Sequence, residues 1–192
     1  MKYLPEVTLI CLTNKDFEGH KKAIDKSCEE IEFGGVKLIW DEDIKSIDDW
    51  NRKIIFDLPK YVDTKFALLI HADGYVSKPD LWNDEWLSYD YIGAPWPLPS
   101  DGYSYLTPSG ELVRVGNSVS LRSKKLMDLV ATRPMEYHYG NNNEDGQICV
   151  WEREWLESQG CKFAPLEVAI HFSKEHEIDE NKGLDTFMFH SL

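Results

Sequence analysis

The strongest candidate for a functional site is the stretch His71-Ala-Asp-Gly74, in which an imidazole and a carboxylate are two residues apart. It follows the apolar run 66–70, whose composition predicts a buried strand of a parallel or mixed sheet. Ligands of open α/β sheets bind beyond the carboxyl ends of the strands, so both side chains are candidates for a ligand site. Gly74 is expected to supply a turn with positive φ as the chain leaves the sheet. The alternative is a polar turn that carries no chemistry.

The elements that would position this stretch begin in β-α-β order. Residues 6–13 predict a strand, residues 18–31 an amphipathic helix ended by Gly34-Gly35, and residues 36–40 a second strand. This order predicts that the two strands are parallel and joined by a right-handed crossover.

The rest of the chain continues the alternation of helices and strands. Residues 98–110, rich in Pro, Ser, Asp and Gly, predict a surface loop. The predicted fold is α/β, a Rossmann-like mixed central sheet flanked by helices, in a single domain over residues 1–192. Further helices are predicted at 50–56 (after a Ser46 cap), 123–132 and 143–158, and a short helix or turn at 79–87. Further strands or extended pieces are predicted at 89–94, 162–165 and 169–172, with two strands within 111–121.

Composition narrows the classes of partner. The formal net charge of −13 and the pI near 4.8 predict a surface that repels nucleic acid and anionic membranes. A nucleotide is still compatible with this charge, because a divalent cation can screen its phosphates from carboxylates. The sequence has no apolar run long enough to span a bilayer and no secretory signal at its start. Four cysteines without metal-site spacing favour reduced thiols, and together these features predict a cytoplasmic protein.

Several short blocks between residue 66 and the end of the chain resemble one family. The most specific is Tyr89-Asp-Tyr-Ile-Gly-Ala-Pro-Trp96. The family is domain of unknown function 5672, an uncharacterised group of small glycosyltransferase-like proteins with the GT-A fold. The chain departs from the family pattern at Ser118-Val119, where the family usually has glycines and a phenylalanine. The other matching blocks are Leu69-Ile-His-Ala-Asp-Gly74, Val115-Gly-Asn-Ser-Val-Ser-Leu-Arg122, Asn143-Glu-Asp145, Phe163-Ala-Pro165 and Phe189-His190.

The resemblance implies a metal-dependent glycosyltransferase that moves a sugar from a nucleoside-diphosphate sugar to an acceptor hydroxyl. His71-Ala-Asp73 is similar to the DXD metal motif of GT-A enzymes, with histidine in place of the first aspartate. The resemblance makes Asp73 and His190 the ligands of Mn²⁺ or Mg²⁺, and the imidazole of His190 favours Mn²⁺. His71 is expected either to bind the metal or to orient the diphosphate.

The same resemblance places catalysis at Glu144-Asp145. Asp145 is expected to act as general base on the acceptor hydroxyl, which would invert the anomeric centre. Glu144 is expected to contact the sugar or the acceptor. The alternative for Asp145 is a carboxylate at a helix N-terminus that only complements the helix dipole.

The donor would be held by residues from three other segments. Thr13 and Asn14, at the end of the first predicted strand, are candidates for contacts to the base or ribose. Gly116 and Asn117 are similar to a glycine-containing donor loop of GT-A enzymes. Trp96 is a candidate floor for the sugar site, as are Trp82 and Trp86, and core packing is the alternative for all three. Arg122 is expected to pair with a carboxylate or a phosphate, or to be a solvated charge before a helix.

Two other functions remain open from the sequence. One is a catalytically inactive GT-A-like module that binds a nucleotide sugar or a glycan, which the changes at His71 and Ser118-Val119 make plausible. The other is a nucleotidyltransferase, although the chain has no glycine-rich basic phosphate loop. The acceptor is a glycan or a small molecule; a modified base in phage DNA is disfavoured by the acidic charge.

Overall fold

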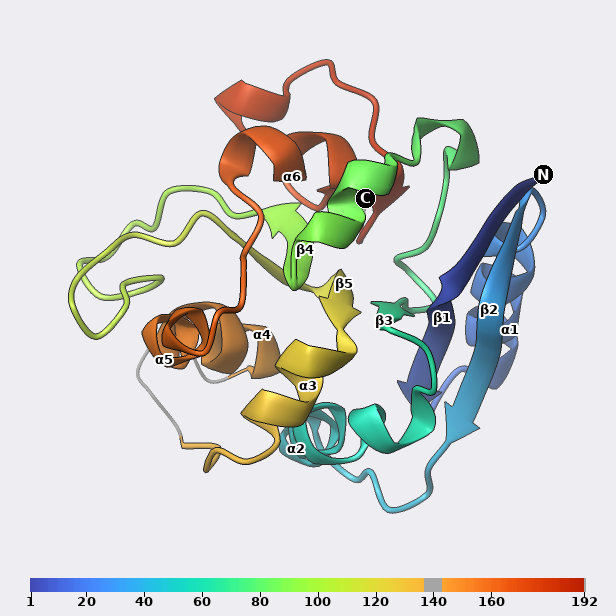
Figure 1. The fold of residues 1–192 in the computed structure, drawn as a ribbon, viewed down its shortest axis with the longest axis horizontal. Coiled ribbons are helices and arrows are strands. Elements are labelled where there is room, and N and C mark those ends of the chain that lie inside the picture. Colours follow the sequence, from blue (N-terminus) through green and yellow to red (C-terminus); the bar gives the residue numbers. More distant parts are fainter. Residues whose placement is uncertain (137–142, 192) are drawn as a thin grey trace.

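The structure is a computed structural model that describes residues 1–136 and 143–191 (Figure 1). The strands are β1 (Lys2–Thr13), β2 (Ile31–Trp40), β3 (Phe66–Leu69), β4 (Tyr91–Pro95), β5 (Val115–Ser123), β6 (Ser173–Lys174) and β7 (Met188–Phe189). The α-helices are α1 (Phe17–Ser27), α2 (Ile47–Phe56), α3 (Lys124–Val130), α4 (Glu144–Gly146), α5 (Arg153–Ser158) and α6 (Leu166–Phe172). Short 3₁₀ or π-helical turns are η1 (Leu58–Tyr61), η2 (Pro79–Leu81), η3 (Asp84–Ser88), η4 (Gln147–Trp151) and η5 (Asp179–Asn181).

Five strands form one mixed sheet in the order β2-β1-β3-β5-β4. Strand β1 is parallel to β2 and β3, whereas β5 is antiparallel to β3 and β4. The apolar strand β3 lies in the middle, as its sequence predicts. Because β1 and β3 are parallel, their carboxyl ends meet at one edge of the sheet. Antiparallel β5 pairs Ser120 with Leu69, which brings the amino-terminal half of β5 to the same edge.

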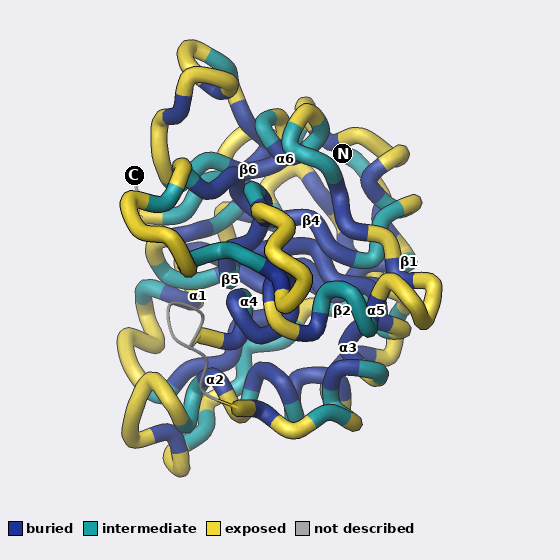
Figure 2. The backbone as a smooth tube through the Cα atoms, turned by 90° about the vertical axis from the view of Figure 1, so that its left-hand side faces the viewer, coloured by how far each residue is buried: buried dark blue, intermediate teal, exposed yellow. Residues whose placement is uncertain are grey.

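Helices cover both faces of this sheet, which confirms the predicted α/β class. The period-two alternation of strands sends Leu9 and Leu68 into a core shared with α1 and α6. Their neighbours Ile10 and Leu69 point to the other face and pack with side chains of α2 and α3. Figure 2 shows the sheet as the buried interior, with exposed backbone mainly in the connections. Among the described residues, no helix is long and apolar enough to cross a membrane.

Two glycines predicted to end the first helix lie inside a strand instead. Helix α1 ends at Ser27, and Gly34 and Gly35 belong to β2. A Cβ atom on Gly34 would lie 2.0 Å from the carbonyl oxygen of Pro5, where the register of β1 against β2 shifts. The glycine is therefore needed for close approach of two backbones, a tertiary requirement that resembles a helix stop in the sequence.

Three further element predictions were wrong. The predicted strand at 169–172 is the end of α6, which begins after Pro165 and buries Ala169 and Phe172 one helical turn apart. The two predicted strands within 111–121 are one strand, β5. The helix predicted over 143–158 is interrupted by the π-helical turn η4, in which the N–H of Glu152 donates to the carbonyl of Gln147 at 2.9 Å.

Candidate functional site

A cavity of about 860 Å³ opens at the sheet edge where β1 and β3 end. Segments from most of the chain contribute to its wall: the end of β1, the loop before α2 and α2 itself, the turn after β3, β5, the start of α4, and the segments after β6 and β7. The lining residues considered below are Thr13, Asn14, Trp50, Asn51, His71, Asp73, Asn117, Asp145, Glu175 and His190. The cavity therefore lies at the sheet edge where the sequence predicts a ligand site.

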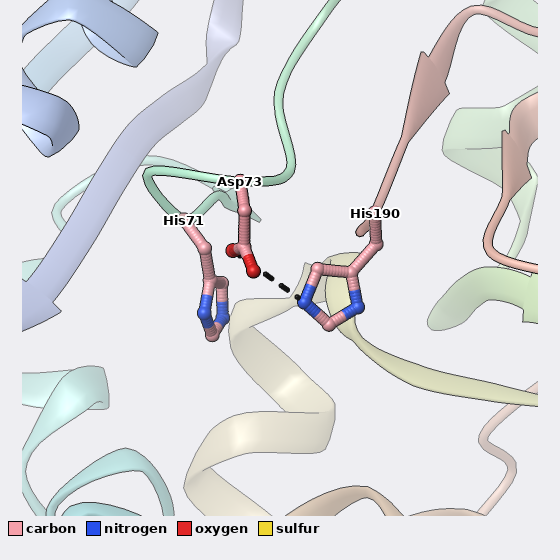
Figure 3. A group of neighbouring side chains, drawn as sticks. All are labelled: His71, Asp73 and His190. Carbon is pink, nitrogen blue, oxygen red and sulfur yellow. Dashed lines mark ion pairs between the residues drawn. The ribbon is translucent and has the colours of Figure 1, made fainter. Parts of the chain in front are cut away.

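His71, Asp73 and His190 form the only group of potential metal ligands found among the described residues (Figure 3). Each offers one ligand atom, and these atoms lie within 4.8 Å of one another. Nε2 of His190 is 3.7 Å from Oδ1 of Asp73, and the two imidazole rings are 5.3 Å apart between centroids. A tight turn after β3, in which the N–H of His71 donates to the carbonyl of Gly74 at 2.8 Å, places the first two residues.

Gly74 serves this site through its small size and not through positive φ, contrary to the prediction. Its φ lies outside the left-handed region, whereas Gly110, Gly160 and Gly183 lie inside it. A Cβ atom on Gly74 would lie 2.6 Å from Val119 and 2.9 Å from the ring of His190. The absence of a side chain thus lets the carboxy-terminal segment pack directly against the turn that carries Asp73.

The protonation states of His71 and Asp73 suit the binding of a metal ion. Burial lowers the pKa of His71 to about 3, so its imidazole is neutral at pH 7, the form that binds metal ions. Burial would raise the pKa of Asp73, but a 2.9 Å hydrogen bond from the Ser191 hydroxyl and the charge of His190 outweigh it and keep the pKa below its usual value. One neutral imidazole and one carboxylate are therefore available without further titration near pH 7.

An orphaned atom also fits a metal at this position. Nε2 of His71 is buried and has no hydrogen-bond partner, an arrangement that costs free energy unless something else satisfies the atom. Two imidazoles and one carboxylate suit Mn²⁺, Fe²⁺ or Zn²⁺ better than Mg²⁺, which prefers oxygen ligands. The residues present therefore fit a transition-metal ion, and His71 fits the ligand role that the sequence left open.

Asp145 and Glu144 both line the cavity. The Asp145 side chain is half-buried and accepts a 2.9 Å hydrogen bond from the N–H of Gly146. Burial, together with the charge of Glu144, raises the pKa of Asp145 to about 7. A carboxyl group with this pKa can exchange a proton near neutral pH.

Glu144, predicted to contact the sugar or acceptor, is fully buried, and its carboxylate has a partner within the protein. Its Oε1 accepts a hydrogen bond from the Arg122 guanidinium at 3.0 Å, and its backbone N–H donates to Oδ1 of Asn51 at 3.2 Å. Arg122, also buried, donates in addition to Ser120 and to the carbonyl of Ser118. The structure thus gives Glu144 the task of anchoring the start of α4, and Arg122 is a paired and not a solvated charge.

We expect Arg122→Leu to destabilise the protein by about 3–5 kcal/mol, because it leaves the Glu144 carboxylate buried without its partner. The double variant Arg122→Leu/Glu144→Leu should recover most of this loss, since neither charge then remains in the core. Urea denaturation of the wild-type protein and both variants measures the difference. A loss of about 1 kcal/mol or less in the single variant would mean that the pair behaves like a solvated surface pair.

Thr13 and Asn14, the candidates for contacts to the base or ribose, line the cavity, but part of their hydrogen-bonding capacity is used within the protein. The Thr13 hydroxyl accepts from the N–H of Lys15 at 3.1 Å and donates to its carbonyl. The Asn14 amide donates to the carbonyl of Ile44. Both side chains therefore shape the end of β1 where it borders the cavity.

The predicted donor loop at Gly116-Asn117 is divided between cavity and core. Asn117 lines the cavity with a φ of 84°, and its side chain accepts from the N–H of Val119 at 2.9 Å. Gly116 does not line it, because the ring of Trp96 occupies the space beside its Cα. Trp96 stacks on Tyr105 at a centroid distance of 4.5 Å and is buried.

The three tryptophans considered for a sugar site are therefore core residues. Trp82 and Trp86 are buried and pack edge-on against each other, with centroids 5.4 Å apart. Both also contact the ring of Phe187. The wall of the cavity contains a different tryptophan, Trp50, whose ring lies 5.2 Å from that of His71.

Sequence reasoning missed Glu175, Trp50 and Asn51. Glu175 follows β6 in a charged tail segment that gave no signal of its own, and it contacts His190. Trp50 and Asn51 stand in α2, where Asn51 is a polar residue with almost no exposed surface. A buried asparagine inside an amphipathic helix pattern was the available signal, because such a side chain must find a partner in the fold.

Comparison with known proteins supports the family resemblance and nothing finer. No curated protein matches the chain. A family model described as "Protein of unknown function (DUF5672)" matches residues 45–190. The matched range includes His71, Asp73, Asp145 and His190 but not Thr13 and Asn14. The chain therefore belongs to the DUF5672 family.

Proposed function

We propose that this protein is a metal-dependent glycosyltransferase that uses a nucleoside-diphosphate sugar. The observation that carries the proposal is the meeting, in one cavity, of the His71–Asp73–His190 group with the carboxyl group of Asp145. Such a reaction needs a cationic centre for the diphosphate and a proton acceptor for the attacking hydroxyl. The cavity wall offers candidates for both.

The metal-ligand group and Asp145 have different parts in the proposed transfer reaction. A metal held by His71, Asp73 and His190 would supply Lewis-acid stabilisation of the leaving diphosphate. Asp145 takes the proton of the acceptor hydroxyl while the oxygen of that hydroxyl bonds to the anomeric carbon. The bond from that carbon to the diphosphate breaks, and the diphosphate leaves with the electron pair. Attack from the side opposite the leaving group inverts the anomeric centre, and the pKa of about 7 suits Asp145 to this role.

The electrostatics of the cavity also support a metal requirement. Acidic side chains outnumber lysines in its wall, and the whole chain carries a net charge of −13. The acidic residues are Asp16, Asp73, Glu144, Asp145 and Glu175, and the lysines are Lys15 and Lys45. A diphosphate brought into this field without a cation would be repelled. We propose a glycan or a small molecule as acceptor and the cytoplasm as the compartment.

We therefore expect nucleoside-diphosphate binding to depend on a divalent cation. Calorimetry with UDP, GDP and TDP, each with Mn²⁺, Mg²⁺, Zn²⁺, Fe²⁺ or EDTA, measures this dependence. Binding with Mn²⁺ and none in EDTA is the expected result. Equal affinity in EDTA would remove the metal from the proposal.

A donor screen separates transfer from mere binding. The protein is incubated with Mn²⁺ and a panel of nucleoside-diphosphate sugars, and slow hydrolysis of the donor is followed. Release of the diphosphate from one donor supports a transferase. Tight donor binding without any turnover would favour the alternative of an inactive GT-A-like binding module, and transfer of a nucleotidyl group would favour a nucleotidyltransferase.

A further inference from the structure

Glu175 lies beside His190 because a small second sheet brings two distant segments together. Strands β6 and β7 are parallel, with Ser173 opposite Met188 and Lys174 opposite Phe189. The N–H of His190 donates to the carbonyl of Lys174 at 2.9 Å, which continues this register by one residue. The backbone therefore fixes the two side chains as neighbours.

The two nitrogens of His190 face different carboxylates. Nε2 faces Oδ1 of Asp73 at 3.7 Å, on the side of the metal-ligand group. Nδ1 faces Oε1 of Glu175 at 3.2 Å. Nδ1 is buried and makes no hydrogen bond in the structure, and Oε1 of Glu175 at 3.2 Å is an acceptor within reach of it. The other oxygen of Glu175, Oε2, lies 3.4 Å from Nε2 of the exposed His176.

We propose that Glu175 is a positioning residue that accepts the Nδ1 proton of His190 in a hydrogen bond and thereby directs the Nε2 lone pair at the metal. A histidine that binds a metal through one nitrogen commonly donates the other N–H to a carboxylate, which fixes both the tautomer and the ring orientation. Glu175 contacts the far side of the ring and is not one of the three grouped ligands, so it acts through His190.

This inference rests on the proposed function only for the presence of the metal. Its first test needs no metal: ¹⁵N NMR of the His190 ring, recorded in the metal-free protein at a pH at which the ring is neutral. We expect the Nδ1–H tautomer in the wild-type protein and loss of that preference in Glu175→Ala. An Nε2–H tautomer in the wild-type protein would overturn the inference and leave the proposed function standing.

The second test is the affinity for Mn²⁺ alone, measured by electron paramagnetic resonance of the free ion. We expect Glu175→Ala to weaken binding about 10–100-fold, the usual effect of losing an outer partner of a ligand histidine. Glu175→Gln should restore most of the affinity, because its amide oxygen can accept the same hydrogen bond. Glu177→Ala is the matched control, since Glu177 is an exposed glutamate of the same segment that pairs with Lys174.

A double variant identifies the route of the effect. In a His190→Ala background, whose weak residual Mn²⁺ affinity is measured at high ion concentration, Glu175→Ala should cause no further loss of that affinity, because the group that it orients is gone. An equal loss in both backgrounds would show that Glu175 acts on the metal by itself and would overturn the positioning role. Absence of Mn²⁺ binding by the wild-type protein would instead overturn the proposed function, and this inference with it.

Discussion

Asp145→Asn is expected to lower the rate of sugar transfer about 10²–10⁴-fold while donor affinity stays close to that of the wild-type protein. The amide is nearly isosteric with the carboxyl group but cannot accept a proton at neutral pH. In the proposed function, donor binding depends on the metal-ligand group and the end of β1, and the substitution alters neither. Single-turnover transfer rates and calorimetry with the donor diphosphate measure the two effects separately.

Stability distinguishes a catalytic Asp145 from one that only complements the helix dipole. The folded-state pKa of about 7 lies above the ordinary value of 3.8, so the carboxyl group stabilises the fold fully only below about pH 4. That contribution is lost as the pH rises through 7, where the group ionises in a buried position. Asp145→Asn should therefore melt no lower than the wild-type protein at pH 8, whereas the dipole alternative expects a loss of about 0.3–1 kcal/mol.

The matched control for this variant is Asp179→Asn, an exposed carboxylate in the first turn of η5 that does not line the cavity. It should leave the transfer rate unchanged. Near-normal transfer by Asp145→Asn would remove Asp145 from catalysis.

The transfer rate of the wild-type protein should rise with pH up to about 7, because the ionised carboxylate is the active form of the base.

Asp73→Ala should abolish metal-dependent binding of a nucleoside diphosphate without unfolding the protein. Asp73 is the only carboxylate of the metal-ligand group, and its side chain is largely exposed, so the fold does not depend on its burial. Loss of a direct ligand should cost more than the roughly 10–100-fold that follows loss of an outer partner. His190→Ala should have a similar effect, and calorimetry with UDP and Mn²⁺ measures both.

His171→Ala provides the control, because His171 is an exposed histidine of α6 outside the cavity wall. Circular dichroism melts of all three variants test whether the fold is intact. If His190→Ala bound Mn²⁺ and UDP like the wild-type protein, the carboxy-terminal segment would be a structural strap and the ligand set would have to be sought elsewhere in the cavity.

The sequence by itself determined which strand lies at the centre and where the site lies. Residues 66–69 are apolar without interruption, and only a strand covered on both faces buries every side chain of such a run. A polar turn directly after that strand must lie at the sheet edge, so His71 and Asp73 could be located from local pattern alone. Local chemistry likewise predicted the Ser123 cap, whose hydroxyl accepts from the N–H of Leu126 at 3.0 Å.

Only the tertiary structure decided which distant residues complete the site and which candidates fall outside it. The family resemblance suggested His190, but the β6–β7 pairing that brings it and Glu175 to the cavity could not be predicted, because two-residue strands leave too short a pattern in the sequence. Trp96 lies in the core. The sequence could not predict this, because an aromatic side chain suits a sugar site and a packed interior equally well. Glu144 and Asp145 are adjacent in the chain and both line the cavity, yet the carboxylate of Glu144 is paired with the buried Arg122, whereas the side chain of Asp145 is partly exposed.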